Sequence, residues 1–295
     1  KKNAEVTTNL QGIDHLNQIV VGKVNVLNLW KEGVNLEFGK NDDNVGKYAI
    51  KSFVAATKAL KEGIVDILVT APINKYNIQS EEFKFPGHTD YLDKELEGNA
   101  LMLMVHDKLR IGLLTDHIPV NEVSKHLTAE LLEQKVQIIT NTLMQDFGIS
   151  KPKIAVLGLN PHCGDNGVIG KEDEEIIRPT IKKMFDSGTM VFGPYASDSF
   201  FGSFQYEKYD AILAMYHDQG LIPFKTLSFG NGVNYTAGLS KVRTSPDHGT
   251  AFEIAGKGLA NPNSFREALY LAIDIYYKRN EYQQLTENPL KIKQM

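Results

Sequence analysis

Three histidines in this sequence each follow a short apolar run and lie against residues that form turns. They are His117 in T-D-H-I-P, His162 in G-L-N-P-H-C-G and His217 in A-M-Y-H-D-Q-G. A single histidine in such a place is more often a structural residue than a ligand. In an open α/β sheet, however, ligands usually bind in the crevice beyond the carboxyl ends of the strands. Three imidazoles at one edge could bind a single divalent metal, so the repeated placement predicts a metal site.

The apolar runs before these histidines are residues 111–114, 154–159 and 211–215, and each predicts a short buried strand. Amphipathic stretches predict helices over residues 45–61, 128–147, 172–187 and 264–278, and another helix begins near Tyr91. A further strand is predicted over residues 64–70, and residues 101–105 and 109–114 have the spacing of a hairpin. This alternation predicts an α/β protein with a mostly parallel sheet. No linker divides the chain. Two domains would therefore have to share the sheet, or the chain would have to pass between them more than once.

The composition limits the partners and the compartment. The chain has 295 residues, and 32 Lys and Arg against 36 Asp and Glu give a formal net charge of -4. This balance provides no basic surface for nucleic acid, and no apolar stretch is long enough to span a membrane. The single cysteine, Cys163, cannot form an internal disulfide, and we expect it to be a small residue in a turn rather than a nucleophile. A soluble protein of the reducing cytoplasm is therefore expected.

Two glycine-containing regions differ in what they predict. The spacing G-x-x-G-x-x-G over residues 164–170 fits neither the dinucleotide fingerprint nor the P-loop, which favours a tight turn that carries His162. Lys225, Asn234 and Arg243 lie further along the chain, in a region punctuated by glycines. A lysine, an amide and an arginine suit a phosphate or a carboxylate. The same three residues would equally suit an ordinary solvated charged face.

Eight motifs occur in order along the chain. They are T-A-P-I-N-K (70–75), F-P-G-H-T-D-Y (85–91), T-D-H-I-P (115–119), L-G-L-N-P-H-C-G (157–164), G-P-Y-A-S-D-S-F-F (193–201), A-M-Y-H-D-Q-G-L-I-P-F-K (214–225), G-V-N-Y-T-A-G-L (232–239) and R-T-S-P-D-H-G-T-A-F-E-I-A-G-K-G (243–258). Together they resemble the motifs of the 4-hydroxythreonine-4-phosphate dehydrogenases of pyridoxal phosphate biosynthesis. The tandem of Y-H-D-Q-G and D-H-G-T-A is hard to obtain by accident.

The resemblance implies an α/β/α fold like that of isocitrate and isopropylmalate dehydrogenases, with two domains flanking a cleft. Residues 1–85 and 250–295 would form the first domain, and residues 86–249 the second. It also implies a homodimer with active sites at the interface, and NAD or NADP bound without a Rossmann fingerprint. Family members open with a strand and a G-D-x-x-G-I-G-P-E-like loop, which this sequence does not contain. If the protein itself has no such segment, the first domain would lack its leading strand and part of the cleft.

The motifs assign roles by resemblance. A divalent metal such as zinc, magnesium or cobalt would be bound by His117, His162 and His217. The phosphorylated substrate would be bound by His88, Thr89, Lys225, Asn234 and Arg243. The segment near the dinucleotide would comprise Asp247, His248, Gly249 and Thr250.

The implied reaction oxidises 4-phosphooxy-L-threonine to 2-amino-3-oxo-4-phosphooxybutanoate, a β-keto acid that decarboxylates to 3-amino-2-oxopropyl phosphate. Three neutral imidazoles leave positions open on a divalent ion, where a substrate hydroxyl can bind and become more acidic. A base then takes the hydroxyl proton while hydride leaves the same carbon for the nicotinamide. Asp218 and Asp247 each lie beside a motif histidine, and each is equally a candidate for this base or for a residue that orients an imidazole.

Two other functions are compatible with the sequence. A paralogue that oxidises a different phosphorylated hydroxy acid, such as a four-carbon sugar acid phosphate, would keep all eight motifs. A metal-dependent hydrolase or an acyltransferase of similar fold would need no dinucleotide, and the hydrolase would use a metal-bound water. A binding module without activity would leave the strand-end histidines without a use.

Overall fold

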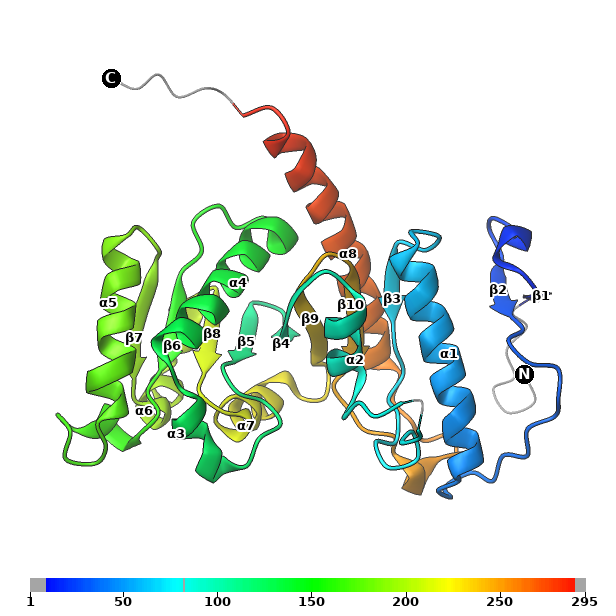
Figure 1. Ribbon diagram of the computed structural model, residues 1–295, viewed down its shortest axis with the longest axis horizontal. Helices are drawn as coiled ribbons and strands as arrows, with labels where there is room; N and C mark the ends of the chain where they lie inside the picture. The colour runs from blue at the N-terminus through cyan, green and yellow to red at the C-terminus, as the bar shows by residue number, and fades with distance from the viewer. Residues whose placement is uncertain (1–8, 82, 290–295) are drawn as a thin grey trace.

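An eight-stranded sheet runs through the centre of the protein, for which a computed structural model describes residues 9–81 and 83–289 (Figure 1). From edge to edge its strands are β3 (Ile67–Val69), β10 (Val242–Pro246), β9 (Val233–Leu239), β4 (Gly98–His106), β5 (Leu109–Leu113), β8 (Ala211–Ala214), β6 (Ile154–Leu157) and β7 (Val191–Tyr195). Strands of both expected domains pair in this sheet, because β3 lies beside β10. The division into two domains stays a prediction.

Neighbouring strands are parallel toward both edges of the sheet and antiparallel in its centre. The pairs β5–β8, β8–β6, β6–β7 and β3–β10 are parallel. The pairs β10–β9, β9–β4 and β4–β5 are antiparallel. Two residues join β4 to β5 and two join β9 to β10, and connections this short permit only antiparallel pairing. The sheet is therefore mixed, which corrects the expectation of a mostly parallel sheet.

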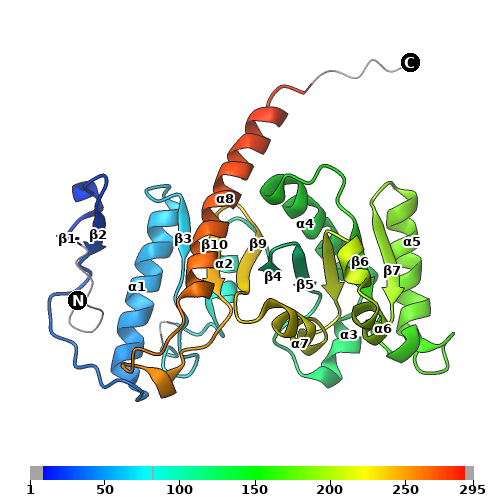
Figure 2. The ribbon, with the colours of Figure 1, turned by 180° about the vertical axis from the view of Figure 1, so that it is seen from behind.

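Helices cover both faces of the sheet, which confirms the predicted α/β/α architecture. One face carries α4 (Ala129–Phe147), α5 (Arg178–Asp186) and α8 (Asn263–Thr286). The other face carries α1 (Asp43–Lys61), α2 (His88–Glu95), α6 (Ser197–Gly202) and α7 (His217–Ser228) (Figures 1 and 2). Successive side chains of β4 point to opposite faces of the sheet. Leu101 and Leu103 therefore pack in the core beneath α4, α5 and α8, and Met102 and Met104 pack in the core beneath α6 and α7.

The helices follow the sequence pattern closely at α1 and α4 and depart from it at α5, at α8 and at α2, which begins at His88 rather than near Tyr91. Residues 172–187 do not form one helix, because a π-helical turn, Asp173–Ile177, precedes α5. Pro179 lies in the first turn of α5 and has no N–H group to donate, which interrupts the regular ladder. The last helix continues to Thr286 rather than ending at residue 278. A short α3 (Val123–His126) lies ahead of α4.

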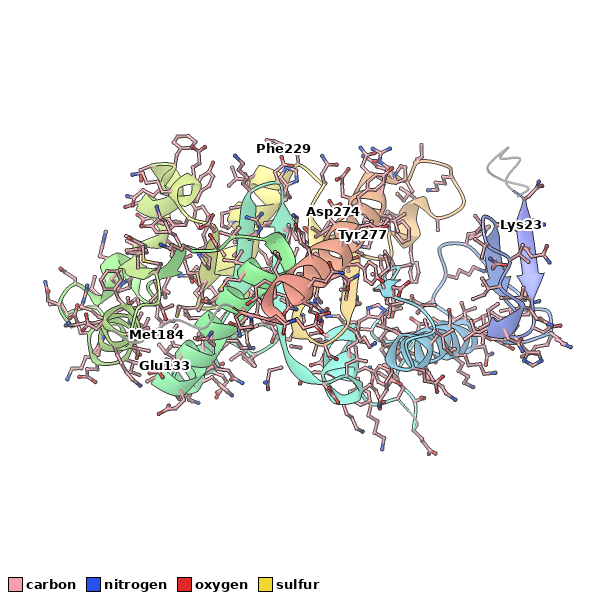
Figure 3. The ribbon with its side chains drawn as sticks, turned by 90° about the horizontal axis from the view of Figure 1, so that it is seen from above. Lys23, Glu133, Met184, Phe229, Asp274 and Tyr277 are labelled. Carbon is pink, nitrogen blue, oxygen red and sulfur yellow. The ribbon has the colours of Figure 1, made fainter. Side chains whose placement is uncertain are left out.

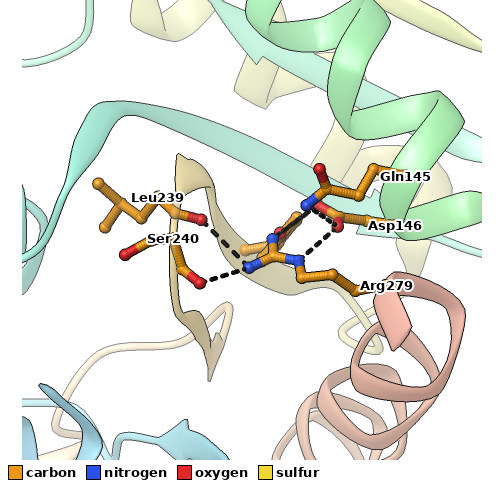
Figure 4. Close-up of polar contacts among 6 residues, drawn as sticks. Gln145, Asp146, Leu239, Ser240 and Arg279 are labelled. Atoms are coloured by element: carbon orange, nitrogen blue, oxygen red, sulfur yellow. Dashed lines mark hydrogen bonds and ion pairs between the residues drawn. The ribbon is translucent and has the colours of Figure 1, made fainter. Parts of the chain in front are cut away.

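The part of α8 that continues beyond residue 278 is held to the fold by a buried ion pair. Arg279 donates to Asp146 of α4 at 2.9 and 3.1 Å and to the hydroxyl of Tyr235 on β9 at 3.0 Å. It also donates to the backbone carbonyls of Leu239 and Ser240 (Figure 4). This network joins α8, α4 and the centre of the sheet. Figure 3 shows the result, with α8 and its labelled residues Asp274 and Tyr277 crossing the middle of the molecule.

A second, smaller sheet lies near the beginning of the described chain. β1 (Leu10–Ile13) and β2 (Val24–Leu27) pair in parallel, apart from the large sheet and beyond α1 (Figures 1 and 2). The sequence pattern predicts neither strand. Among the described residues, no helix has the length and apolar character needed to cross a membrane.

Candidate functional site

His117 and His217 lie beside each other because their strands end side by side. β5 and β8 are parallel neighbours, and the hydroxyl of Thr115 continues the pairing by donating to the carbonyl of Met215 at 2.7 Å. Each histidine follows two residues later, and the ring centroids are 5.9 Å apart. For these two residues, the strand ends do deliver imidazoles to one edge of the sheet.

His162 follows β6, on the other side of β8, and lies in a separate cavity. It belongs to the 3-10 turn Pro161–Gly164, in which His162 (φ 55°) and Cys163 (φ 53°) both have left-handed backbone. Cys163 is buried in this tight turn, as expected. Within the residues that the structure describes, no three His, Cys, Asp or Glu side chains are grouped so that they could hold a metal. One chain thus supplies two adjacent imidazoles, and the three-histidine site stays a prediction.

A small cavity of about 250 Å³, which we refer to as the polar pocket, collects most of the other residues singled out from the sequence. Its lining includes His88, Thr89, His117, Lys225, Asn234, Arg243, Asp247, His248 and Gly249. Thr250, expected near the dinucleotide, does not line it. A larger cavity of about 1100 Å³ lies between α8 and the β4–β5 hairpin and contains none of the expected residues.

Arg243 is buried at the polar pocket, with hydroxyl groups rather than carboxylates as its partners. It is 2% exposed. Its Nη2 and Nε donate to Thr70 Oγ1 at 2.6 and 3.1 Å, and its Nη1 donates to Thr236 Oγ1 at 3.0 Å. No acidic side chain of the described residues forms an ion pair with it. Burial lowers the pKa of Arg243 to about 9. The pocket therefore contains a positive charge that a bound anion would neutralise.

Three other groups of the pocket are suited to a polar ligand. In the described structure, Asn234 Oδ1 is buried and has no hydrogen-bond partner, which is unfavourable unless a ligand supplies a donor. Lys225 Nζ lies 3.4 Å from Asp247 Oδ1. The lysine side chain is 56% exposed and the aspartate 13%. Burial raises the pKa of Asp247, and the charge of Lys225 opposes this effect.

The start of α2 adds an anion-binding feature. Gly87 is the N-cap and has no side chain to accept from the N–H groups of the first turn, so these groups are available to a ligand. His88 is the first residue of α2, and its ring packs edge-on against Phe53 at 4.6 Å. Burial, followed by the charges of Arg243 and Lys75, lowers the pKa of His88 to about 3. His88 is therefore a neutral hydrogen-bonding group near pH 7.

The two candidate bases occupy different positions. Asp218 is largely exposed, and its Oδ1 lies 2.7 Å from His217 Nδ1, a distance that suits a residue orienting the imidazole. Asp247 instead lines the polar pocket. Lys75 also lines this pocket, and its Nζ lies 3.4 Å from His117 Nε2. The sequence gives no role for Lys75, and the one signal that could have pointed to it is its place in the T-A-P-I-N-K motif.

His162 lines a second cavity of about 710 Å³, which we refer to as the apolar pocket. Phe201, Phe204 and Ile222 line it together with Asp218. Phe204 is 62% exposed and Ile222 is 64% exposed. Large apolar side chains gathered at the surface around a polar group are typical of a protein interface.

The loop that carries His162 is held by a carboxylate that the sequence did not single out. Asp173 is fully buried and accepts from Leu159 N at 2.9 Å, from Asn160 N at 3.1 Å and from Asn160 Nδ2 at 2.9 Å. It is the first residue of the π-helical turn, and such turns are frequent at functional sites. The helical pattern of residues 172–187 places Asp173 on a helix but does not indicate this contact, which depends on the turn.

Comparison with known proteins finds relatives across nearly the whole chain. Residues 1–272 match the family model described as pyridoxal phosphate biosynthetic protein PdxA. A protein of Bacteroides thetaiotaomicron named 4-hydroxythreonine-4-phosphate dehydrogenase is 48% identical over 293 residues, which cover 99% of this chain and 80% of the relative. A protein of the same name from Sulfurihydrogenibium sp. is 42% identical over 275 residues, or 92% of this chain and 84% of the relative.

The fold also has a close counterpart among solved structures. The crystal structure of 4-hydroxythreonine-4-phosphate dehydrogenase from Klebsiella pneumoniae aligns with a TM-score of 0.77 at 34% sequence identity. The alignment covers 91% of this chain and 82% of that chain. The likeness therefore extends over most of the fold.

Proposed function

Because this chain belongs to the family of pyridoxal phosphate biosynthetic protein PdxA, we propose that it catalyses the reaction for which its relatives are named. The chain is an oxidoreductase. The proposed reaction oxidises 4-phosphooxy-L-threonine to 2-amino-3-oxo-4-phosphooxybutanoate, which then loses carbon dioxide to form 3-amino-2-oxopropyl phosphate on the route to pyridoxal 5'-phosphate. The observation that carries the proposal is the buried Arg243 at the polar pocket, which has hydroxyl partners and no carboxylate partner among the described residues.

The phosphate of the substrate would bind at Arg243. Its guanidinium is already oriented by two threonine hydroxyls, so little ordering is needed when an anion enters. Lys225 adds a second positive charge, and the uncapped first turn of α2 at His88 and Thr89 adds N–H donors. The amide of Asn234 completes the polar surroundings of the ligand. These contacts would fix the substrate carbon that is oxidised.

Oxidation removes a proton from the substrate hydroxyl and a hydride from the carbon that carries it. We assign the proton to Asp247, because a pocket carboxylate whose pKa is raised by burial is a better acceptor than an ordinary exposed one. NAD or NADP supplies the hydride acceptor when bound. A pocket of about 250 Å³ holds only the small substrate, so the dinucleotide would border Asp247, His248 and Gly249, which line the pocket, and the adjacent Thr250.

His117 and His217 would supply two ligands for a divalent metal such as zinc, magnesium or cobalt. Burial, followed by the charge of Lys75, lowers the pKa of His117, and this favours the unprotonated ring that a metal requires. We assign the third ligand to His162 of the partner subunit, because His162 lines the apolar pocket with its interface-like surface. When bound, the metal would make the substrate hydroxyl more acidic. The active unit would then be a homodimer, and we place it in the cytoplasm because the single cysteine points to no disulfide.

A spectrophotometric assay tests the reaction. The purified enzyme should form NADH or NADPH from 4-phosphooxy-L-threonine, and a metal chelator should abolish this activity reversibly. A four-carbon sugar acid phosphate, tested in parallel, should be oxidised with a much lower kcat/KM. Preference for the sugar acid phosphate would assign a different substrate. Release of inorganic phosphate without any need for a dinucleotide would indicate a hydrolase instead.

Metal analysis tests the ligands separately from activity. Replacement of His117, His162 or His217 by alanine should abolish stoichiometric metal in the purified, folded dimer, because each change removes one of three imidazoles. Undiminished metal in two of the three variants would contradict the three-histidine site.

A further inference from the structure

Three cations line the polar pocket, and they differ in their partners. Arg243 is bound to the hydroxyls of Thr70 and Thr236, and Lys225 pairs with Asp247 at 3.4 Å. Lys75 has neither kind of partner. Within the described part of the chain, no carboxylate lies at ion-pair distance from its ammonium group, and its close polar contact is His117 Nε2 at 3.4 Å.

The backbone at Lys75 is well anchored, so its position at the pocket is a property of the fold. Its carbonyl accepts from Gln79 Nε2 at 3.1 Å, and the same amide donates to the carbonyl of Phe85 at 3.0 Å. On the preceding residue, Asn74 Oδ1 accepts from the N–H of Tyr76 at 2.9 Å. The loop is therefore held at several points, while the lysine side chain is free to reach a ligand.

Lys75 and Arg243 both line the polar pocket, but they differ in how deeply they are buried. Both charges lower the pKa of His88, which also lines the pocket. Arg243 is almost fully buried, whereas Lys75 is exposed at the rim. A phosphate bound to Arg243 would leave the ammonium of Lys75 without a partner. A metal cation on His117 would moreover repel this ammonium from Nε2 and leave it available to a second anionic group.

We propose that Lys75 binds the carboxylate of a substrate whose phosphate is bound by Arg243. The substrate is then a small phosphorylated hydroxy acid with an anionic group at each end. Lys75 makes the site selective for this class over phosphorylated alcohols that have no carboxylate. This inference rests on the proposed function, and specifically on the phosphate site at Arg243.

Calorimetric binding without dinucleotide tests this role, because no turnover occurs. The metal-loaded dimer is titrated with three probes: 4-phosphooxy-L-threonine, 3-amino-2-hydroxypropyl phosphate, which is the same molecule without the carboxylate, and inorganic phosphate. In Lys75→Met, we expect the first probe to bind roughly tenfold or more weakly, because a charge-assisted contact is lost. The other two probes should bind as they do to the unaltered protein. Lys75→Arg should restore much of the loss.

Two control variants separate the possible failures. Lys84→Met removes an exposed lysine that does not line the pocket, and it should leave all three affinities unchanged. Arg243→Met should weaken all three probes. Equal weakening of all three by Lys75→Met, or no weakening of any, would overturn the carboxylate role while leaving the phosphate site intact. If Arg243→Met has no effect on inorganic phosphate, the phosphate site itself is wrong and both proposals fail.

Discussion

Arg243 is the residue on which the proposed anion site depends most directly. Its guanidinium makes three hydrogen bonds to Thr70 and Thr236 and still presents a charge without a carboxylate partner among the described residues. A lysine at this position would keep the charge and lose the planar fork that donates to both hydroxyls and that we propose to bind the phosphate. The role of Arg243 therefore depends on geometry as well as charge.

We expect Arg243→Lys to raise KM for the phosphorylated substrate and to reduce transition-state binding by about 1 to 3 kcal/mol. Steady-state kinetics measures both quantities. Arg266→Lys, which changes an exposed arginine of α8, is the control and should leave kcat/KM unchanged. An unchanged KM in Arg243→Lys would place the phosphate elsewhere.

The lowered pKa of His88 predicts how the free energy of unfolding depends on pH. Its pKa is lowered from 6.5 to about 3 in the folded protein, mainly by burial. Below pH 6.5 the unfolded chain therefore binds a proton that the folded chain rejects, and this destabilises the folded state as the pH falls toward 3. At pH 5 the loss amounts to about 2 kcal/mol from this residue.

His88→Gln removes this titration and should therefore lose less stability than the unaltered protein between pH 8 and pH 5, by about 2 kcal/mol. Urea unfolding at the two pH values measures the difference. The same substitution at the exposed His126 serves as the control. A parallel loss in His88→Gln and in the unaltered protein would mean that His88 is not held neutral by the fold.

At the scale of elements, the loops after the strands decide where the functional side chains lie. The loop after β5 stays beside the end of β8, because Thr115 bonds to the carbonyl of Met215. The loop after β6 turns through left-handed residues at His162 and Cys163 and is held by the buried Asp173. Parallel strands alone would bring three histidines to one edge. The loops instead leave one of them in a different pocket.

Asp173→Asn should destabilise this loop, because an amide offers an N–H group where Leu159 and Asn160 already present donors. We expect the free energy of unfolding to fall by about 1 to 3 kcal/mol. Chemical denaturation measures this change, and metal analysis should show weaker loading, since the loop carries His162. The control Glu175→Gln changes an exposed carboxylate two residues away. Equal unfolding midpoints for the two variants would show that Asp173 does not hold the loop.

At the scale of the whole molecule, the two pockets raise the question of which subunit supplies which residue. Arg243 and His117 line the polar pocket, and His162 lines the apolar pocket of the same chain. If one active site combines the polar pocket of one subunit with His162 of the partner subunit, lesions in the two pockets belong to different sites. A symmetric dimer makes this testable by mixing subunits.

A heterodimer of a His162→Ala subunit and an Arg243→Ala subunit should recover up to about half of the unaltered activity, because one site collects both lesions and the other is intact. Kinetic assay of the isolated heterodimer measures the recovery. The control pairs Arg243→Ala with His117→Ala, two residues of one pocket. There each site carries one lesion, and no activity should return. Recovery in the control, or none in the test pair, would contradict the shared site.

Local features of the sequence determine the elements and much of the list of site residues. The apolar runs at residues 111–114, 154–159 and 211–215 form β5, β6 and β8, and the amphipathic stretch at 128–147 forms α4. Such elements can be predicted because a helix with one buried face has apolar residues at regular spacing, and a short buried strand has a continuous apolar run. The substrate residues expected from the motifs, including Lys225 and Arg243, all line the polar pocket. Their catalytic and binding roles stay predictions.

Only the tertiary structure decides what these residues contact. The spacing of residues 101–105 and 109–114 predicts the β4–β5 hairpin. The other antiparallel pairs depend on β9 and β10, whose sequences mix glycine, asparagine and proline with apolar residues and so have no clear strand period. The partners of Arg243 are Thr70, 173 residues away, and Thr236. The approach of Lys75 to His117 likewise joins two loops that are 42 residues apart. Contacts between distant segments depend on strand order and loop geometry, which no local pattern of residue types records.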